Sequence, residues 1–411
     1  MNLPVRLAGR LVGMLSAPAQ GPLSFRYDEA WLAEPRAFPI SLSLPLGPEL
    51  VEGAAAHAFF ANLLPEGRVR TLVCRRLGLS EENDAALLAA IGGECAGALT
   101  IGEAPAEAGY DELESRELAD LARAGGALPT MAGRRGVRLS LAGAQDKLPV
   151  RIDGGRVLLP LGDAPSTHII KFPNRDFAHL PANEAIVTAL ASRMGLPVCE
   201  VDLLRTPAGP VLLVRRYDRT VELDGRIRRL HQEDFCQAFG FPPARKYEGE
   251  GGPSFAACNQ LVVAHSTLPV ADTRALLRWA AFNAIVGNAD GHAKNLAFLR
   301  HDGGDLRLAP FYDLLCTSVY RLIDRHLAMS IGGQNDPGQL QGSHWRALAE
   351  EIGVRPTYAT DLVREMGDGL PDAVRDVAAQ FRERHGSSPA LEMLGRALRK
   401  QARRMLQLLS E

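Results

Sequence analysis

The sequence predicts an α+β protein in which a small mixed N-terminal domain precedes a strand-rich part and then a helical part. Apolar residues alternate through the first hundred or so residues, with proline and glycine turns between the segments. Alternation returns from about residue 135 to 230, whereas from residue 233 almost to the end the apolar spacing is helical. The length of 411 residues suits two or three domains, and we predict boundaries at 1–105, 106–235 and 236–411.

The N-terminal domain is expected to contain strands and two helices, the second of which ends at Gly78. Its predicted strands are residues 5–15, 23–27, 40–46 and 98–102, and its predicted helices lie near 59–64 and 69–77. Residues 103–113, rich in Glu, Ala, Pro and Gly, are expected to form a linker.

The middle part alternates like a sheet and contains one amphipathic helix. Asp-Gly-Gly at 153–155 and Asp-Gly at 224–225 indicate hairpin turns. The predicted strands are 148–152, 156–161, 167–172, 201–204 and 211–217, and the predicted helix is 182–194.

Composition excludes some classes of protein. No apolar run reaches the roughly 18 residues of a membrane helix, and the start of the chain is a poor signal peptide, so we expect a cytoplasmic protein that does not enter a membrane. The six scattered cysteines are expected to be buried thiols. A net charge of −2 argues against nucleic-acid binding by bulk charge, although the arginine clusters at 134–135, 215–216 and 399–404 could form local basic patches or merely solvated faces.

Residues 283–298 contain the most informative motif. Asp290 and Asn295 have the D-x-x-x-x-N spacing of a kinase catalytic loop, in which the Asp accepts a proton and the Asn holds a metal ion. Asp313 follows a predicted hairpin and could bring a second oxygen ligand to Mg²⁺. The alternative is that Asp290 and Asn295 cap a turn while Asp313 caps a helix.

Three further segments could contact a nucleotide. Lys171 ends an apolar strand, where it could pair with Glu184 and bind phosphates, or simply extend to solvent. The small-residue turn at 140–149 could cradle phosphates with its backbone N–H groups, or be a plain β-turn. The segment 231–235 resembles an adenine-binding hinge, although Glu233 and Asp234 could instead cap a helix.

Taken together and in order, these segments resemble the HipA family of serine/threonine-protein kinase toxins, over about residues 5–320. The resemblance implies a two-lobed kinase-like fold, with a strand-rich N-lobe and a helical C-lobe, behind a small N-terminal α+β domain. The motifs that carry it are FFANLLPEG, RLSLAGAQDKLPV, STHIIKFP, NEAIVTALA, VRRYDR, LHQEDFCQA, KYEGEGG, GNADGHAKNLAF and LAPFYDLL.

The resemblance assigns expected roles to matching residues, with ATP and Mg²⁺ as cofactors. Asp290 would be the catalytic base, and Lys294 would steady the γ-phosphate. Asn295 and Asp313 would bind Mg²⁺. The expected ATP-binding residues are Ala142, Gly143, Ala144, Gln145, Lys171, Glu233, Asp234, Phe235 and His292, the last of which could equally be a structural hydrogen-bonding residue.

Ser140 matches the serine that this family autophosphorylates, and we expect its phosphorylation to silence the kinase; a β-turn serine without a regulatory role is the alternative. The family also implies a separate HipB-like helix-turn-helix antitoxin, operator DNA bound through that antitoxin, and an aminoacyl-tRNA synthetase as substrate, with glutamyl-tRNA synthetase the first expectation.

Two other functions stay open at this point. One is a catalytically idle co-repressor that acts with the antitoxin on operator DNA, and the other is a kinase for a small molecule. The sequence also departs from ordinary protein kinases. Asn288-Ala289 stands where His-Arg would precede the base, and no D-F-G follows, so residues 314–337 need not behave as an activation segment.

Overall fold

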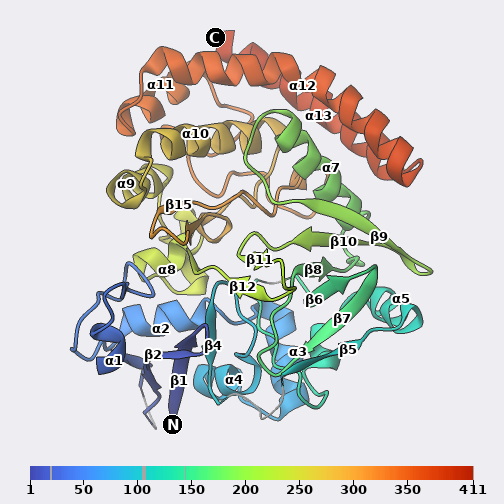
Figure 1. Ribbon diagram of the computed structural model, residues 1–411. Coiled ribbons are helices and arrows are strands. Elements are labelled where there is room, and N and C mark those ends of the chain that lie inside the picture. Colours follow the sequence, from blue (N-terminus) through green and yellow to red (C-terminus); the bar gives the residue numbers. More distant parts are fainter. Residues whose placement is uncertain (19–20, 104–107, 144, 411) are drawn as a thin grey trace. The chain divides into compact units, whose positions relative to one another are not determined.

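The computed structural model describes residues 1–18, 21–103, 108–143 and 145–410 (Figure 1). It consists of two compact units, and the chain passes between them several times. Unit 1 comprises Met1–Pro173, Leu204–Arg245 and Ala297–Gly304, and unit 2 comprises Asn174–Leu203, Lys246–Leu296 and Asp305–Glu411.

Unit 1 begins with an antiparallel sheet of strand order β3-β2-β1-β4. Its elements are β1 (Asn2–Leu7), β2 (Arg10–Ser16), β3 (Ser24–Tyr27), α1 (Glu29–Leu32), α2 (Ala54–Ala61), α3 (Gly67–Leu77), α4 (Asp84–Ile91) and β4 (Leu99–Ile101). Both predicted helices are present, and α3 ends at Gly78, whose φ of 68° suits a residue without a Cβ atom.

The strand predicted at 40–46 is wrong. Pro39 and Pro45 cannot donate ladder hydrogen bonds, and the Leu42 N–H donates to the Glu233 carboxylate at 3.2 Å rather than to a neighbouring strand. The segment forms only an isolated bridge between Ser41 and Leu44. A side chain far along the sequence therefore takes the backbone donor that a sheet would have used.

A second sheet of unit 1 has the strand order β5-β7-β6-β8-β10-β9, and the residues of β9 from Leu204 onward belong to this unit. The turn predicted at 153–155 is present, with Asp153 opposite Arg156. The strands are β5 (Gly109–Glu112), β6 (Lys147–Asp153), β7 (Arg156–Leu161), β8 (His168–Lys171), β9 (Val201–Thr206) and β10 (Gly209–Arg215).

The linker predicted at 103–113 is partly wrong, because Gly109–Glu112 forms strand β5 at the sheet edge, paired with β7. Tyr110 holds this edge: its hydroxyl donates to the Pro165 carbonyl at 2.8 Å, and the Arg151 guanidinium lies 5.0 Å from its ring centroid. Residues 104–107 of the predicted linker lie outside the described residues.

The remaining elements of unit 1 are short. Strand β13 pairs with β14, which comes more than sixty residues later in the chain. They are α5 (Ser115–Ala124), α6 (Leu128–Met131), β11 (Arg219–Val221), β12 (Ile227–Arg229), β13 (Gln232–Asp234), α8 (Phe235–Phe239), η1 (Pro243–Arg245) and β14 (Ala297–Arg300).

One hydrophobic core runs through both sheets of unit 1. It includes Phe25 within the first sheet, Phe60 on α2, and Val150 and Ile170 within the second sheet. Because a shared core makes the two sheets fold as one body, the N-terminal part and the strand-rich part are not independent globules.

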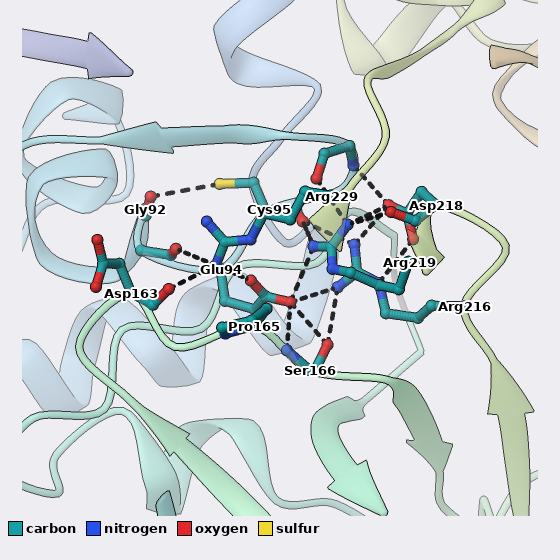
Figure 2. Close-up of polar contacts among 12 residues, drawn as sticks. Gly92, Glu94, Cys95, Asp163, Pro165, Ser166, Arg216, Asp218, Arg219 and Arg229 are labelled. Carbon is teal, nitrogen blue, oxygen red and sulfur yellow. Dashed lines mark hydrogen bonds and ion pairs between the residues drawn. The ribbon is translucent and has the colours of Figure 1, made fainter. Parts of the chain in front are cut away.

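A buried network of charged residues also connects the N-terminal part with the strand-rich part (Figure 2). The Glu94 carboxylate, fully buried, accepts from the Ser166 N–H and hydroxyl at 2.9 and 2.7 Å. It also pairs with three arginines, and Asp218 pairs with two of the same three. The pairs with distances are Arg216–Glu94 at 3.1 Å, Arg219–Glu94 at 2.9 Å, Arg216–Asp218 at 2.7 Å and Arg219–Asp218 at 3.0 Å, and Arg229 also contacts Glu94.

The network overturns one expectation from the sequence. The sequence predicts Arg216 on the surface, in a basic patch or a solvated face at 215–216, but its side chain is buried and pairs with Glu94 and Asp218. The arginine cluster at 134–135 differs, since Arg134 forms half-exposed pairs with Asp111 and Glu117.

Unit 2 is mainly helical, and α12 and α13 run side by side in it (Figure 1). The expectation of helix from 233 almost to the end fails between α10 and α11, where loops and short elements carry the predicted site residues Asp290, Asn295 and Asp313. The elements are α7 (Leu180–Arg193), η2 (Glu248–Glu250), α9 (Phe255–His265), α10 (Pro269–Val286), η3 (Ala293–Asn295), β15 (Leu306–Leu308), η4 (Thr317–Val319), α11 (Gly342–Glu351), α12 (Pro356–His385) and α13 (Pro389–Ser410).

Two predictions from composition can be compared with the structure. All six cysteines are buried free thiols, as expected. Over the described ranges, no helix combines the length and apolar character needed to cross a membrane.

Candidate active site

The predicted catalytic loop starts where α10 ends. Gly287 caps this helix with φ of 67°, and an added Cβ atom would lie 2.5 Å from the Gln401 side chain. Thr317 then fastens the loop, because its hydroxyl accepts from the Ala289 N–H at 2.8 Å and donates to the Gly287 carbonyl at 3.0 Å. The Thr317 hydroxyl thus holds the loop at Gly287 and at Ala289, immediately before Asp290.

Asp290 lies at the exposed tip of this loop, with 49% of its side chain accessible. Its carbonyl accepts from the His292 N–H at 2.9 Å and from the Asn295 Nδ2 at 2.7 Å. The five-residue spacing read from the sequence therefore corresponds to a closed turn. Its carboxylate accepts a hydrogen bond from the Tyr247 hydroxyl at 2.5 Å, and it remains open enough for a substrate to approach.

Asn295 and Asp313 are suitable ligands for a hard cation. Since Asn295 uses its amide nitrogen in the turn, its Oδ1 is directed away from that hydrogen bond. Asp313 adopts φ of 57°, one of three non-glycine residues with positive φ among those described. The neighbouring Tyr312 hydroxyl donates to the Lys294 carbonyl at 2.6 Å and so joins the Asp313 segment to the catalytic loop. An amide and a carboxylate oxygen fit Mg²⁺, which takes its other ligands from water and phosphates.

His292 is a buried, neutral residue of the loop. Burial, together with the nearby charges of Lys246 and Lys294, lowers its pKa to about 3, and the charge of Asp313 opposes this shift. Its Nε2 lies 3.8 Å from the Asp290 Oδ1, too far for a hydrogen bond. Because the ring is uncharged near neutral pH, this approach is not an ion pair.

In unit 1, the predicted phosphate-binding turn follows Ser140. Gly143 has φ of 109°, and its carbonyl accepts from the Glu66 N–H at 3.1 Å. Gln145 is half-buried, and its amide donates to the Phe172 carbonyl at 3.4 Å. Ala142 is likewise half-buried, and Ala144 lies outside the described residues.

Ser140 is completely buried in this structure. Its hydroxyl donates to the Leu63 carbonyl at 2.7 Å, and its N–H donates to the Glu94 carbonyl at 3.0 Å. A kinase could reach this hydroxyl only after the segment had left its place.

Lys171, the last residue of β8, is buried and lies in register between Lys147 of β6 and Leu212 of β10. Glu184 on α7 is buried within unit 2. The pairing of Lys171 with Glu184 stays a prediction.

The predicted hinge residues make contacts within unit 1. The Glu233 carboxylate accepts from the Ser41 hydroxyl at 2.6 Å, and burial raises its pKa to about 7 although Ser41 and Leu42 oppose the rise. Asp234 caps α8 through a hydrogen bond from the Gln237 N–H at 2.9 Å. The Phe235 ring is buried, with its centroid 4.9 Å from that of Phe298.

Comparison with known proteins identifies the family. Residues 139–374 match the model of the HipA-like C-terminal domain, and residues 3–102 match that of the HipA N-terminal domain. The chain belongs to the HipA family. The predicted α+β kinase-like fold and the assignment to serine/threonine kinases are thereby confirmed, while the domain boundaries stay a prediction.

Two related sequences and one solved structure show how far the similarity extends. The kinase Y4mE of Sinorhizobium fredii is 40% identical over 91% of this chain and 90% of its own length. The serine/threonine-protein kinase toxin HipA of Shewanella oneidensis is 30% identical over 92% of this chain and 89% of its own. A solved S. oneidensis HipA, in complex with HipB and its operator DNA, has 28% identity and a TM-score of 0.85, covering 99% of this chain and 98% of that one.

Sequence reasoning missed several residues that contact the predicted site. Tyr247 lies within KYEGEGG, a motif already noted for the family, so the signal was present but no role was read from it. Tyr312 likewise lies within the motif LAPFYDLL, from which no role was read for it, whereas Thr317 had no such signal, because its contact with the loop is long-range and leaves no spacing pattern.

Proposed function

We propose that this HipA-family kinase transfers the γ-phosphoryl group of ATP to a protein serine, with Asp290 as the base. The observation that supports the proposal best is the catalytic turn itself, which holds Asp290 at an exposed position and turns the Asn295 oxygen away from the backbone. Asp290 would orient the attacking hydroxyl and accept its proton. Lys171 and the turn at 142–145 would bind the ATP phosphates.

Asn295 and Asp313 would hold Mg²⁺, which, when bound, neutralises charge on the phosphates. Lys294 would steady the γ-phosphate, and Glu233, Asp234 and Phe235 would lie near the adenine. His292, neutral and buried, would support the loop rather than exchange protons. Positioning and charge neutralisation would thus supply most of the catalysis.

The protein substrate would be an aminoacyl-tRNA synthetase, with glutamyl-tRNA synthetase first, and its modification would halt translation and growth. The test is transfer of labelled phosphate from ATP with Mg²⁺ to a panel of purified synthetases. One labelled synthetase would name the substrate. If the active kinase labels none of them, this substrate class is wrong.

Ser140 would be the site of self-inactivation. Phosphorylation adds about −1.5 to −2 charge at pH 7. In the buried site the Ser140 hydroxyl donates to a carbonyl, and a carbonyl oxygen cannot donate to a phosphate oxygen. The phosphorylated segment should therefore stay out of this buried site. We expect Ser140→Ala to keep its activity during preincubation with ATP, whereas the unmodified kinase loses most of it within the same time. Equal losses of activity in both proteins would refute this role.

A second role, binding operator DNA with a HipB-like antitoxin, is favoured by one surface. Helix α13 carries five exposed basic side chains that line a groove of about 540 Å³. Within the described part of the chain, none of the five pairs with a carboxylate. They are Arg396, Arg399, Lys400, Arg403 and Arg404. Their spacing of three and four residues places them along one side of the helix.

This basic face predicts a salt effect. Each phosphate contact contributes about 0.9 to the slope of log affinity against log salt concentration. Changing Arg399, Lys400 and Arg403 together to Gln should therefore reduce the slope for a short DNA duplex by up to about 3. Arg364→Gln on α12, an exposed arginine paired with Asp361, serves as the control and should change it little. An unchanged slope in the triple variant would remove α13 from the DNA-binding role.

A further inference from the structure

Tyr247 lies in a segment to which no role has been assigned, and its side chain contacts the predicted catalytic loop. Its hydroxyl donates to the Asp290 Oδ1 at 2.5 Å. Its ring meets His292 edge to face, with centroids 5.1 Å apart and an interplanar angle of 82°. Alongside, the Ala293 N–H donates to the Lys246 carbonyl at 3.3 Å. The segment therefore contacts the loop through main chain, ring and hydroxyl at once.

The backbone around Tyr247 is itself held firmly. Its carbonyl accepts from the Glu250 N–H at 3.1 Å and from the Gly252 N–H at 2.8 Å. The Glu248 N–H donates to the Ala328 carbonyl at 3.0 Å, and the Glu248 carboxylate accepts from the Ser330 hydroxyl at 3.0 Å. Anchored on both sides, the phenol is a fixed donor rather than a mobile surface group.

The side chain of a half-exposed aspartate on a loop tip can rotate, and only some of its orientations let the carboxylate act as a base. A hydrogen bond to one carboxylate oxygen fixes the direction of the other oxygen and limits that rotation. Since misplacement of a reacting group by about 1 Å can cost a hundredfold in rate, such a restraint has a large effect.

We propose that Tyr247 is a positioning residue, whose hydroxyl holds the Asp290 carboxylate in the orientation that accepts the proton of the substrate hydroxyl. This inference rests on the proposed function, because it assigns to Tyr247 the task of orienting the base of that reaction. Tyr247 acts through Asp290 and needs no contact with the substrate.

The kinetic test compares Tyr247→Phe with the unmodified kinase. The variant keeps the ring against His292 and loses only the hydroxyl, so we expect kcat to fall about ten- to a hundredfold while KM for ATP changes less than about threefold. Tyr358→Phe, which removes a phenol hydroxyl from α12 in the same unit, should leave both constants unchanged. A kcat that is unchanged or higher in Tyr247→Phe would overturn the proposal.

A double-mutant cycle separates positioning from a general structural role. Once Asp290 is Asn, no base remains to be oriented, so adding Tyr247→Phe should lower the residual rate by less than about twofold. If both backgrounds lose the same factor, Tyr247 acts on something other than the base and the inference is wrong.

The contact can also be tested without catalysis. With fluorotyrosine incorporated, the ¹⁹F resonance that disappears in Tyr247→Phe should shift in Asp290→Asn. A resonance that does not move would refute the inference even if the kinase is active. A wild type that transfers no phosphate, but shows the shift, would refute the proposed function and leave the contact established.

Discussion

Asp290→Asn lowers the rate of phosphoryl transfer about a thousandfold, while KM for ATP changes less than about threefold. A general base contributes roughly 10²–10⁴ to a rate, and an amide cannot accept the proton. Asparagine has nearly the same shape and retains an oxygen that can accept from Tyr247, so the loop should keep its conformation. The measurement is steady-state transfer from labelled ATP with Mg²⁺, beside a thermal unfolding curve.

Two outcomes would contradict the role of Asp290. A variant that retains more than about a tenth of the rate would show that Asp290 is not the base. A variant inactive only because its thermal midpoint had fallen would show that the residue supports the fold. A fall in the thermal midpoint is not expected, because half of the Asp290 side chain is exposed and carries little packing.

Glu94→Gln destabilises the protein by roughly 3–5 kcal/mol, the cost of removing one partner from a buried ionic network. Asp218 would still pair with Arg216 and Arg219, but Arg229 would lose its carboxylate partner, so the buried network would hold three cations against one carboxylate. We expect the thermal midpoint of unit 1 to fall by roughly 10 °C, measured by calorimetry. Asp224→Asn, at the exposed Asp224–Arg226 pair, is the matched control and should leave the midpoint unchanged.

The same network predicts an acid limit. Burial alone would raise the pKa of Glu94, but Arg219, Arg229 and Arg216 outweigh it and lower the pKa from 4.5 to about 2. A carboxyl whose pKa is lowered on folding contributes stability above its unfolded pKa and loses it as the pH falls toward the folded value. Stability from Glu94 should therefore decline between about pH 4.5 and 2, and Glu94→Gln should lack that part of the decline. Parallel acid-unfolding curves would argue against the network.

The turn that joins Asp290 and Asn295 was predictable from the sequence, because the two residues are close enough in the chain for one turn to join them. The bond between Tyr247 and Asp290 spans 43 residues and the pair of Arg229 with Glu94 spans 135, so neither leaves a local pattern. An alternating pattern also predicted a strand at 40–46, where Glu233 captures the Leu42 N–H instead. Local spacing is thus informative where the chain closes on itself within a few residues, and silent where distant segments exchange donors and acceptors.

The position of Glu94 limits how this protein can be cut or recombined. A fragment starting at residue 106 would keep Arg216, Arg219 and Arg229 but lose the carboxylate that pairs with all three, together with the carbonyl that receives the Ser140 N–H. A chimera with another N-terminal segment would have to supply a carboxylate at the same place. For an engineer, the N-terminal part is therefore not an exchangeable cassette, and the segments around 94, 140, 166 and 216–229 should be inherited together.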